Sequence, residues 1–398
     1  MTDFAKTRAM FHIPEGMIYL NGNSLGPMPI AAPDAITSFM HDEWKTELIK
    51  GWNTKGWFMQ TNTLGDRIGK LIGAAPDSVV VSDTLSIKVF QAVAAGLAMV
   101  PDRRVILSDE GNFPTDLYMV EGLMKLKADG YELRTPAPEQ VMDAITEEVA
   151  VVMLTEVDYR TSRKHDMAAI IAKAHSVGAV VVWDLAHSVG AIPVDVSATD
   201  TDFAVGCTYK FLNGGPGAPA FIYVAPRLID TVEPALSGWY GHAAPFAFDT
   251  SYRPMPNKID RMRIGTPSIA SFSILEAALD AWEDVDLNDL RAKSIELSEL
   301  FIEQVEARCP GVTLASPRDP QQRGSHVAFR FEHGYPCMQA LIANKVIGDF
   351  RAPDIMRFGI TPLFISRDDI LAGVAILEDI LKNETWKEPR FQTRSAVT

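Results

Sequence analysis

Residues 180–217 read VVVWDLAHSVGAIPVDVSATDTDFAVGCTYKFLNGGPG, and this stretch decides the fold. It holds two apolar runs of the kind found in buried strands. The first run ends in Asp184, with His187 three residues later. The second ends in Tyr209 and Lys210, directly before a glycine-rich loop. Because ligands of open α/β sheets lie beyond the carboxyl ends of the strands, these polar side chains are candidates for one site.

An acid and a lysine at consecutive strand ends indicate a site for pyridoxal phosphate (PLP). Enzymes of this kind hold the cofactor through a lysine as a Schiff base and pair its pyridinium nitrogen with a carboxylate. Lys210 must be deprotonated to react, which a desolvated strand end favours. Asp184 either caps the following turn or keeps the ring nitrogen protonated. His187 is either a buried structural histidine or a contact to the cofactor.

Two further segments suit the rest of such a cofactor. Residues 82–86, SDTLS, lie between an expected strand and an expected helix. Backbone N–H groups and the helix dipole bind anions at such a place, although an ordinary helix cap has the same sequence pattern. Phe113 opens FPTD after another expected strand. Its ring either belongs to the core or lies flat on an aromatic cofactor.

Strands and helices alternate over the first two thirds of the chain, which predicts an α/β fold with a mainly parallel sheet covered on both faces. Residues 225–265 are irregular and rich in Pro, Trp and Tyr, so we expect functional or intersubunit loops there. The expected strands of the large sheet are 79–81, 104–108, 131–135, 149–157, 179–185, 203–208 and 220–224.

A smaller unit follows, with an expected long helix over 288–308, strands over 326–331, 347–350 and 356–360, and a closing helix over 367–383. We therefore expect three parts. Residues 1–50 form an arm and a helix (34–50) that pack with the small domain. Residues 51–270 form a three-layer αβα large domain, beginning with a loop over 51–58. Residues 271–398 form a small α+β domain.

Composition excludes several classes of protein. The 37 basic and 51 acidic residues give a net charge of −14, which argues against nucleic acid or an anionic membrane as the main partner. The three cysteines form no CxxC pair, which disfavours a metal site or a disulfide framework and fits a reducing compartment. No signal peptide and no apolar run long enough to cross a bilayer is present, so we expect a soluble, cytoplasmic protein.

Residues 22–26, GNSLG, match the GxSxG pattern of serine hydrolases and support a rival interpretation. The context is poor, because Pro27 and Pro29 interrupt the turn from strand to helix that the pattern requires. No GxGxxG, GxxxxGK[ST] or HExxH occurs, so nucleotide-binding and zinc-protease functions lack support.

In this order, the motifs of the chain are similar to those of the kynureninase family, fold-type I PLP enzymes of the aminotransferase class V group. The resemblance runs from about Ile18 to about Leu363. The motifs that carry it are YLNGNSLGP (19–27), TLS (84–86), FPTD (113–116), YRTSRKHDM (159–167), WDLAHSVG (183–190), CTYKFLNGGPG (207–217), PALSGWYGH (234–242), RIGTP (263–267), RGSHVAFRF (323–331) and GDFRAPDIMRFGITPL (348–363).

The resemblance implies roles for individual residues. Lys210 is the Schiff-base lysine, Asp184 the partner of the pyridinium nitrogen, and Tyr209 a phosphate ligand and candidate acid or base. Arg357 binds the substrate's α-carboxylate, a pairing that suits a guanidinium group. The other implied contacts to the cofactor are Leu85, Ser86, Phe113, Asp116, Thr155 and His187, and those to the substrate are Ser24 and Trp52.

The resemblance also implies an assembly and a reaction. Trp239 and Thr266 match positions that complete the phosphate site of the neighbouring subunit, which implies a homodimer. The reaction is hydrolysis of L-kynurenine, or of 3-hydroxykynurenine, to anthranilate, or 3-hydroxyanthranilate, and L-alanine in tryptophan catabolism. No metal is involved. Two departures from the family bear on the pocket and the small domain: Asn21 stands where bacterial relatives usually carry Asp, and FISRDD follows TPL.

Three alternatives stay open on the same cofactor. Cysteine desulfuration needs a nucleophilic cysteine in a mobile loop, and neither Cys309 nor Cys337 lies in one. A transaminase would need a keto-acid co-substrate. A PLP-binding protein without catalysis is the third.

Overall fold

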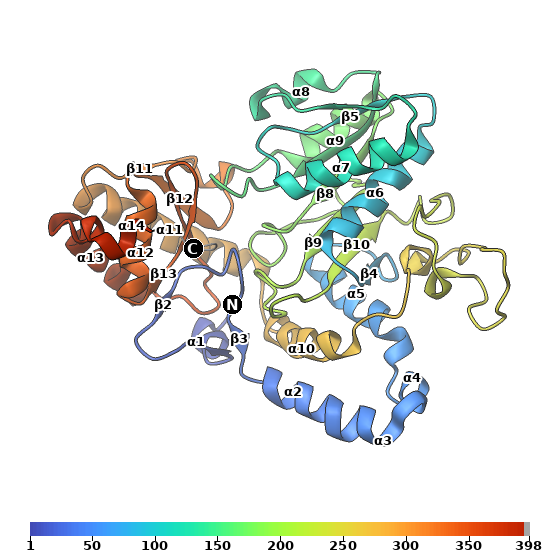
Figure 1. Ribbon diagram of the computed structural model, residues 1–398, viewed down its shortest axis with the longest axis horizontal. Helices are drawn as coiled ribbons and strands as arrows, with labels where there is room; N and C mark the ends of the chain where they lie inside the picture. The colour runs from blue at the N-terminus through green and yellow to red at the C-terminus, as the bar shows by residue number, and fades with distance from the viewer. Residues whose placement is uncertain (394–398) are drawn as a thin grey trace.

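The computed structural model describes residues 1–393 and shows one large sheet with a smaller unit beside it (Figure 1). The large sheet has seven strands in the order β4-β10-β9-β8-β7-β5-β6. All neighbours pair in parallel except β10, which is antiparallel to both β4 and β9. The strands are β4 (Val79–Val81), β5 (Val105–Leu107), β6 (Glu132–Arg134), β7 (Val149–Thr155), β8 (Val180–Asp184), β9 (Phe203–Cys207) and β10 (Ala220–Val224).

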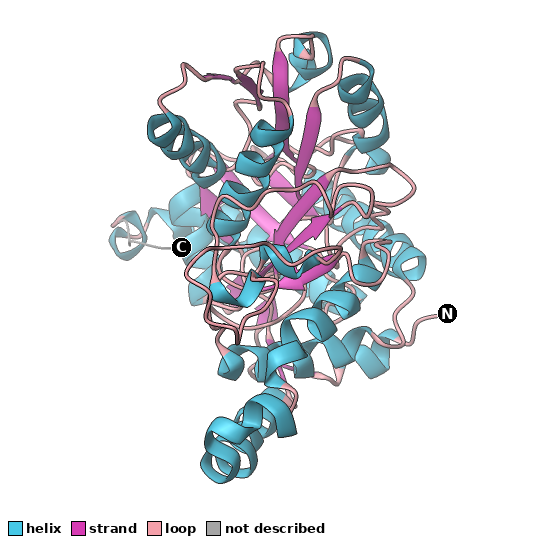
Figure 2. Cartoon of the chain, turned by 90° about the vertical axis from the view of Figure 1, so that its right-hand side faces the viewer, coloured by secondary structure: helices cyan, strands magenta, loops and turns pink. Residues whose placement is uncertain are grey.

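Successive side chains of each strand point to opposite faces of the sheet, and the core is divided accordingly. In β8, Val181 and Trp183 enter one hydrophobic cluster, while Val180 and Val182 enter the other. Helices cover both faces, which gives three layers (Figure 2). The first cluster includes α5 (Gln60–Leu71), α9 (Met167–Ser176) and α10 (Ile269–Leu279), and the second includes α6 (Leu85–Met99) and α7 (Pro114–Lys127).

The smaller unit is built on a four-stranded antiparallel sheet in the order β11-β12-β15-β14. Phe301 packs edge-on against Phe329 and Phe358 of this sheet, with ring centroids 5.6 and 5.1 Å away. The strands are β11 (Thr313–Leu314), β12 (His326–Arg330), β14 (Asp349–Arg351) and β15 (Ile355–Gly359), and the helices are α11 (Leu287–Arg308), α12 (Gly334–Ala343), α13 (Arg367–Lys382) and α14 (Pro389–Gln392).

The N-terminal segment is attached to this smaller unit. It contains α1 (Phe4–Arg8), and its β1 (Phe11–His12) pairs with β3 (Met28–Pro29). Its β2 (Ile18–Tyr19) pairs in parallel with β13 (Val346–Ile347), more than 300 residues later (Figure 1).

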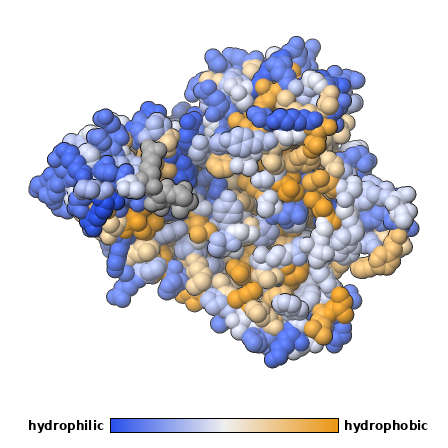
Figure 3. Space-filling view, in the orientation of Figure 1, coloured by the Kyte–Doolittle hydropathy of each residue, from blue (hydrophilic) through white to orange (hydrophobic). Residues whose placement is uncertain are grey.

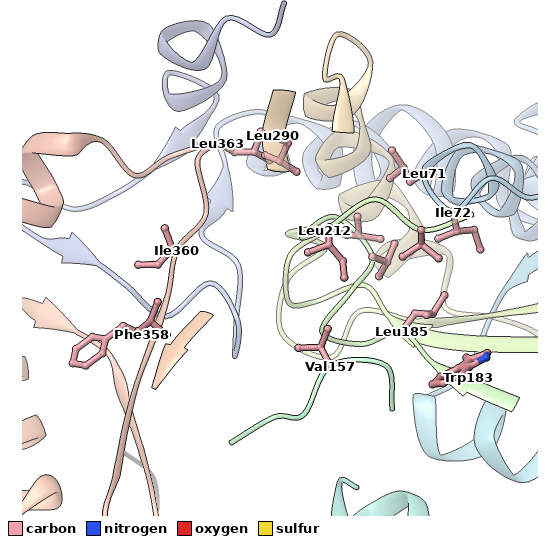
Figure 4. Packing of buried hydrophobic residues seen from close by; sticks show 14 of the residues in the cluster. Leu71, Ile72, Val157, Trp183, Leu185, Leu212, Leu290, Phe358, Ile360 and Leu363 are labelled. Atoms are coloured by element: carbon pink, nitrogen blue, oxygen red, sulfur yellow. The ribbon is translucent and has the colours of Figure 1, made fainter. Parts of the chain in front are cut away.

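One hydrophobic cluster runs from the large sheet into the smaller unit. Its members include Leu71 and Trp183 on one side and Leu290, Phe358 and Leu363 on the other (Figure 4). The hydrophobic core is therefore continuous across the domain boundary that was expected near residue 270. The division into domains stays a prediction.

Helix ends follow local sequence signals. Ser366 accepts a hydrogen bond from the Asp369 N–H, and the Asp369 carboxylate accepts one from the Ser366 N–H, so α13 begins with a capping box. The Asp286 carboxylate caps α11 and that of Asp166 caps α9. Within residues 1–393, no helix combines the length and the apolar character that crossing a membrane requires.

The expected single helix over 34–50 is wrong. The chain forms α2 (Ala32–Ser38), a π-helical segment (39–44), α3 (Lys45–Glu47) and a 3₁₀ turn (48–50), and it is interrupted at Leu48, whose φ is +51°. The expected loop over 51–58 is wrong as well, because it holds α4 (Gly51–Thr54) and the start of another 3₁₀ turn (57–59). Trp57 is only 5% exposed and donates to Glu43 over 2.7 Å. Burial of Trp57 against the preceding helix organises this segment.

Replacing Gly359 by alanine will destabilise the junction between the N-terminal segment and β15. A Cβ atom there would lie 2.3 Å from Asn23 Oδ1 and 2.9 Å from the Asn23 nitrogen. We expect the free energy of unfolding to fall by about 1–3 kcal/mol, which is typical of overpacking. Urea unfolding measures it. Gly122→Ala is the matched control, because open space surrounds that helical position; equal midpoints for the two variants would contradict the prediction.

Candidate active site

The topology brings the candidate residues to one edge of the large sheet. Strands β4, β5, β7, β8 and β9 all run in the same direction, so their carboxyl ends lie side by side. Each end carries residues singled out in the sequence. They are Leu85 and Ser86 after β4, Phe113 and Asp116 after β5, Thr155 in β7, Asp184 in β8, and Tyr209 and Lys210 after β9.

The Lys210 amine lies among several of these side chains. Its Nζ is 3.0 Å from His187 Nε2 and 5.8 Å from the ring centroids of both Phe113 and Tyr209. Burial, followed by the charge of Lys210, holds the pKa of the His187 imidazole well below its usual value. A neutral imidazole can accept a hydrogen bond from the amine, which leaves the side chain of Lys210 oriented within the site.

Two buried carboxyl groups face each other behind Lys210. Asp184 accepts hydrogen bonds from the Ala186 N–H over 2.8 Å and from the Thr155 hydroxyl over 3.3 Å. Burial raises the pKa of Asp184, and burial together with the nearby charge of Asp184 raises the pKa of Asp116 well above its usual value. Oδ2 of Asp116 is buried and has no hydrogen-bond partner among the described residues. One oxygen of the pair therefore lacks a donor, which a protonated ring nitrogen could supply.

An anion site is available at the start of α6. The helix is 15 residues long, and its cap residue Thr84 makes no side-chain capping bond. The first N–H groups of a helix have no partner within the helix, so those of Leu85 and Ser86 can bind a phosphate. Lys88 in the same turn is buried and turned inward, where its Nζ bonds to Ser82 and Gln91. A phosphate bound here would therefore contact backbone groups rather than this lysine.

These residues fit PLP. The lysine matches its aldehyde, and the buried carboxyl pair with one unpartnered oxygen matches its ring nitrogen. The partly exposed phenylalanine face matches its ring, and the free helix N-terminus matches its phosphate. Tyr209 contributes a half-buried phenol whose pKa is raised, chiefly by burial. Its hydroxyl therefore stays protonated at neutral pH and can donate.

A second group of residues surrounds Arg357, whose side chain is 2% exposed. Its Nε donates to Asp349 Oδ1 over 2.7 Å, and its Nη2 donates to the Ser24 hydroxyl over 2.8 Å and to Asp349 Oδ2. Arg351 also donates to Asp349 Oδ2, over 3.0 Å. Sequence reasoning missed Asp349 and Arg351. The sequence signal that was available is the pair of charged residues, Asp349 and Arg351, in the short strand DFR.

Ser24 does not have the environment of a hydrolytic nucleophile. Within residues 1–393, its hydroxyl contacts the Asp349 carboxylate and the guanidinium groups of Arg351 and Arg357, and no imidazole. Its loop is instead packed on the turn that carries Lys210. The Gly26 N–H donates to the Tyr209 carbonyl over 2.8 Å, and a Cβ at Gly26 would lie 2.4 Å from the Lys210 carbonyl. The glycine permits this close approach.

Three predicted site residues lie apart from Lys210. Trp52 and Trp239 both pack edge-on against Tyr240, with ring centroids 6.4 and 4.7 Å away. Thr266 is exposed, in the loop that follows Ile264, whose carbonyl accepts from the Tyr240 N–H. Among the described residues, none of the three makes a hydrogen bond or ring contact with Lys210, Asp184 or Arg357. The contacts described within this chain therefore do not connect these three residues to the Lys210 group.

The carboxyl group of Glu156, next to Thr155, gives a pH-dependent prediction for stability. Burial raises its pKa from 4.5 to about 7. Because the folded state holds this proton more tightly than the unfolded state, stability falls as the pH rises from about 4.5 to about 7 and then levels off. Glu156→Gln mimics the neutral carboxyl group. Over that pH range its free energy of unfolding should fall by about 2–3 kcal/mol less than that of the wild type.

Urea unfolding of the wild type and of Glu156→Gln at pH 5 and pH 8 measures this difference. Glu139→Gln, at an exposed position, is the control. If the wild type and Glu156→Gln lose the same stability between the two pH values, the assignment of a buried neutral carboxyl is wrong.

Comparisons with known proteins agree with the geometry. The sequence model described as the kynureninase C-terminal domain matches residues 290–377. The chain is 47% identical to a kynureninase of Pseudomonas fluorescens and to one of Burkholderia mallei, over 401 aligned residues that cover 99% of this chain and 96% of each relative.

Solved structures share the fold at lower identity. The cysteine desulfurase CsdA from Escherichia coli is 20% identical with a TM-score of 0.79, covering 96% of this chain and 99% of its own. A C-DES variant with glycine linked to its PLP cofactor is 17% identical with a TM-score of 0.80, covering 95% and 100%. The predicted α/β fold of PLP-dependent enzymes is confirmed. The full-length match at 47% identity decides the family, and the chain belongs to the kynureninases.

Proposed function

We propose that the protein hydrolyses L-kynurenine, or its 3-hydroxy derivative, to anthranilate, or 3-hydroxyanthranilate, and L-alanine, with PLP as cofactor. The observation that carries the proposal is the similarity to kynureninases over nearly the whole chain. Incubation of the PLP-loaded protein with L-kynurenine tests it, with anthranilate followed by its fluorescence. Absence of anthranilate from protein that has bound PLP contradicts it. The ratio of kcat/KM for the two substrates establishes the preference between them.

The cofactor would be held from every side by residues of the strand ends. Lys210 would bind its aldehyde carbon and Asp184 its ring nitrogen, with Phe113 against the ring. Bound PLP supplies an electron sink for bonds at the substrate's Cα. The other residues we assign to the cofactor are Leu85, Ser86 and Tyr209 at the phosphate and Asp116, Thr155 and His187 around the ring.

Proton transfers fall to Lys210 and Tyr209. Once the substrate amine has replaced it, the Lys210 amine is placed to take the proton from Cα and to return it. His187, held neutral, accepts a hydrogen bond from that amine and does not compete for the proton. Water must add to the γ-carbonyl before the Cβ–Cγ bond breaks. The Tyr209 hydroxyl, protonated because burial raises its pKa, is our candidate to donate to that carbonyl oxygen.

The substrate's α-carboxylate would bind Arg357 and the Ser24 hydroxyl. Both lie in the group of residues that joins the N-terminal loop to β14 and β15. A buried guanidinium binds a carboxylate through charge-assisted hydrogen bonds, which are about twice as strong as neutral ones.

Cysteine desulfuration is the second candidate, because solved structures of this fold include cysteine desulfurases. That reaction needs a reactive thiolate, and all three thiols of this chain are buried. Burial raises the pKa of Cys309 to about 11 and that of Cys337 to about 12, which keeps both protonated. We therefore expect no sulfide from L-cysteine. The same unpaired cysteines support a cytoplasmic location as part of the proposal.

A homodimer with shared sites is also proposed, with Trp239 and Thr266 completing the partner's phosphate site and Trp52 in the same surface. Exposed hydrophobic side chains support it. Trp239 is 40% exposed and Phe248 83% exposed. Hydrophobic atoms also reach the surface at the lower right of the molecule, near α3 (Figure 3). Other exposed hydrophobic residues of these segments are Met40, Trp44, Leu48, Ile49 and Phe246.

Mixing two inactive variants tests the shared site. We expect Trp239→Ala and Lys210→Ala to be impaired alone and to regain activity when their subunits are exchanged. Half of a random mixture is heterodimer with one intact site in two, so about a quarter of wild-type activity should return. Lys210→Ala mixed with Asp184→Asn is the control. In the proposed arrangement only residues 239 and 266 come from the neighbouring subunit, so Lys210 and Asp184 of one site belong to the same subunit. A heterodimer of these two variants therefore has no intact site. No recovery in the first mixture contradicts the shared site.

A further inference from the structure

Asp349 accepts four hydrogen bonds beside the proposed carboxylate site. It is 1% exposed and opens β14. Its carboxylate accepts from Arg357 Nε, Arg357 Nη2, Arg351 Nη2 and the Ser24 hydroxyl. The neighbouring guanidinium groups and the hydroxyl hold the pKa of Asp349 below its usual value despite burial, so it is ionised.

The contact between Asp349 and Arg357 is fixed by the backbone. The two residues are directly opposite each other in the antiparallel pair of β14 and β15. Directly opposed side chains on one face of such a pair lie about 5 Å apart at Cβ. The sheet register therefore decides which edge of the Arg357 guanidinium the carboxylate occupies, namely the edge formed by Nε and Nη2.

A count of donors shows what remains for a ligand. A guanidinium has five N–H groups. Arg357 uses two on Asp349, one on the Ser24 hydroxyl and one on the Tyr159 carbonyl. One N–H is left, and the Ser24 hydroxyl is the partner that can turn away most easily. A carboxylate that displaces this hydroxyl gains two N–H groups of the same guanidinium.

The charges of these side chains also indicate that the group binds one carboxylate. Arg351 and Arg357 carry one positive charge each and Asp349 carries one negative charge, so the three together carry +1. This charge matches one substrate carboxylate. His187 and His326 lie near this group, and burial is the main cause that keeps the pKa of each imidazole well below its usual value, so both are neutral. Without Asp349, two guanidinium groups would repel each other at a mostly buried site.

We infer that Asp349 is a positioning residue for the α-carboxylate: it fixes the orientation of Arg357, and balances Arg351, so that the remaining N–H groups of Arg357 bind a single carboxylate. Asp349 acts through Arg357 and does not touch the substrate. The inference rests on the proposed function, because that function places the substrate's carboxylate at Arg357.

Two ligands that differ only in their charge test the inference without turnover. The first is 4-(2-aminophenyl)-4-oxobutanoate, which has the aromatic ketone and a carboxylate but lacks the substrate's α-amine, the group that would react with PLP. The second is its primary amide. Titration calorimetry on the PLP-loaded protein gives the dissociation constant of each. The ratio of the two constants is the carboxylate preference, which a general loss of folded protein does not change.

We expect the wild type to prefer the carboxylate and Asp349→Asn to lose between about tenfold and a hundredfold of that preference, as misplacement of a binding group does. With L-kynurenine, KM should rise more than kcat falls. Asp369→Asn is the matched control, because Asp369 also pairs with an arginine, Arg8, and with a serine, Ser366, but outside the site. It should leave the preference unchanged. Asp349→Glu, which keeps the charge but moves the carboxylate, replaces Asp349→Asn if that variant does not fold, and should lose part of the preference.

An unchanged preference in the Asp349 variants overturns the inference. A stronger preference overturns it too, since it would mean that Asp349 competes with the ligand for Arg357. Failure of the proposed function gives a different result: the wild type itself would produce no anthranilate and show no preference for the carboxylate.

Discussion

Turnover of L-kynurenine will fall at least about 10⁴-fold when Lys210 is replaced by alanine, since the change removes the residue that we propose as both the covalent anchor and the base for the Cα proton. The side chain has no substitute nearby. Its Nζ contacts His187, Phe113 and Tyr209, none of which is a primary amine. Anthranilate fluorescence measures the rate. The absorbance band of lysine-bound PLP should disappear from the spectrum of the same preparation.

Lys70→Ala, at an exposed position in α5, is the control and should keep both the rate and the band. Activity of Lys210→Ala above about a hundredth of the wild-type rate would contradict the assignment of Lys210, because general acid–base catalysis alone contributes about 10²–10⁴-fold.

Asp184→Asn will lower kcat/KM by about 10²–10³-fold, the usual effect of removing one preorganised charge from a buried site. Asparagine has the same shape and can still accept from the Ala186 N–H, but it carries no negative charge to keep a ring nitrogen protonated. The PLP-free protein should not lose stability at pH 8. Burial raises the pKa values of both Asp184 and Asp116, so the charged pair is unfavourable there.

Thermal unfolding of the PLP-free protein and kcat/KM of the loaded protein separate the two effects. A parallel fall in both would mean that Asp184 is a structural group. Asp195→Asn, at an exposed position beyond the end of β8, is the control and should change neither quantity.

The sequence alone was sufficient to locate residues whose position depends on a single strand. Asp184 and Lys210 each follow a buried apolar run, so the end of the run locates the side chain at the edge of the sheet. Parallel strands then bring these edges together without further information. The same reasoning located Phe113, whereas Thr155 was named only through the family resemblance.

Residues whose position depends on pairing between distant segments could not be found in this way. The contacts of Asp349 with Arg357 and Ser24 require the register of β14 against β15 and the return of the N-terminal loop. The break at Leu48 was missed because a positive φ at a leucine has no sequence signal. The burial of Trp57 depends on Gly51, where any Cβ would collide with the indole ring.

The pairing of β2 with β13 has a consequence for synthesis of the chain. Residues 18–19 leave the ribosome more than 300 residues before their partners at 346–347. The last strand of the large sheet ends at Val224, so this sheet can form while the N-terminal arm still lacks its partner strand. The arm is therefore translated before the large sheet and can complete its pairing only after the sheet has formed. Since it carries Ser24, a nascent chain that stops before residue 346 can hold a finished sheet and still lack the part of the site that we propose binds the substrate's carboxylate.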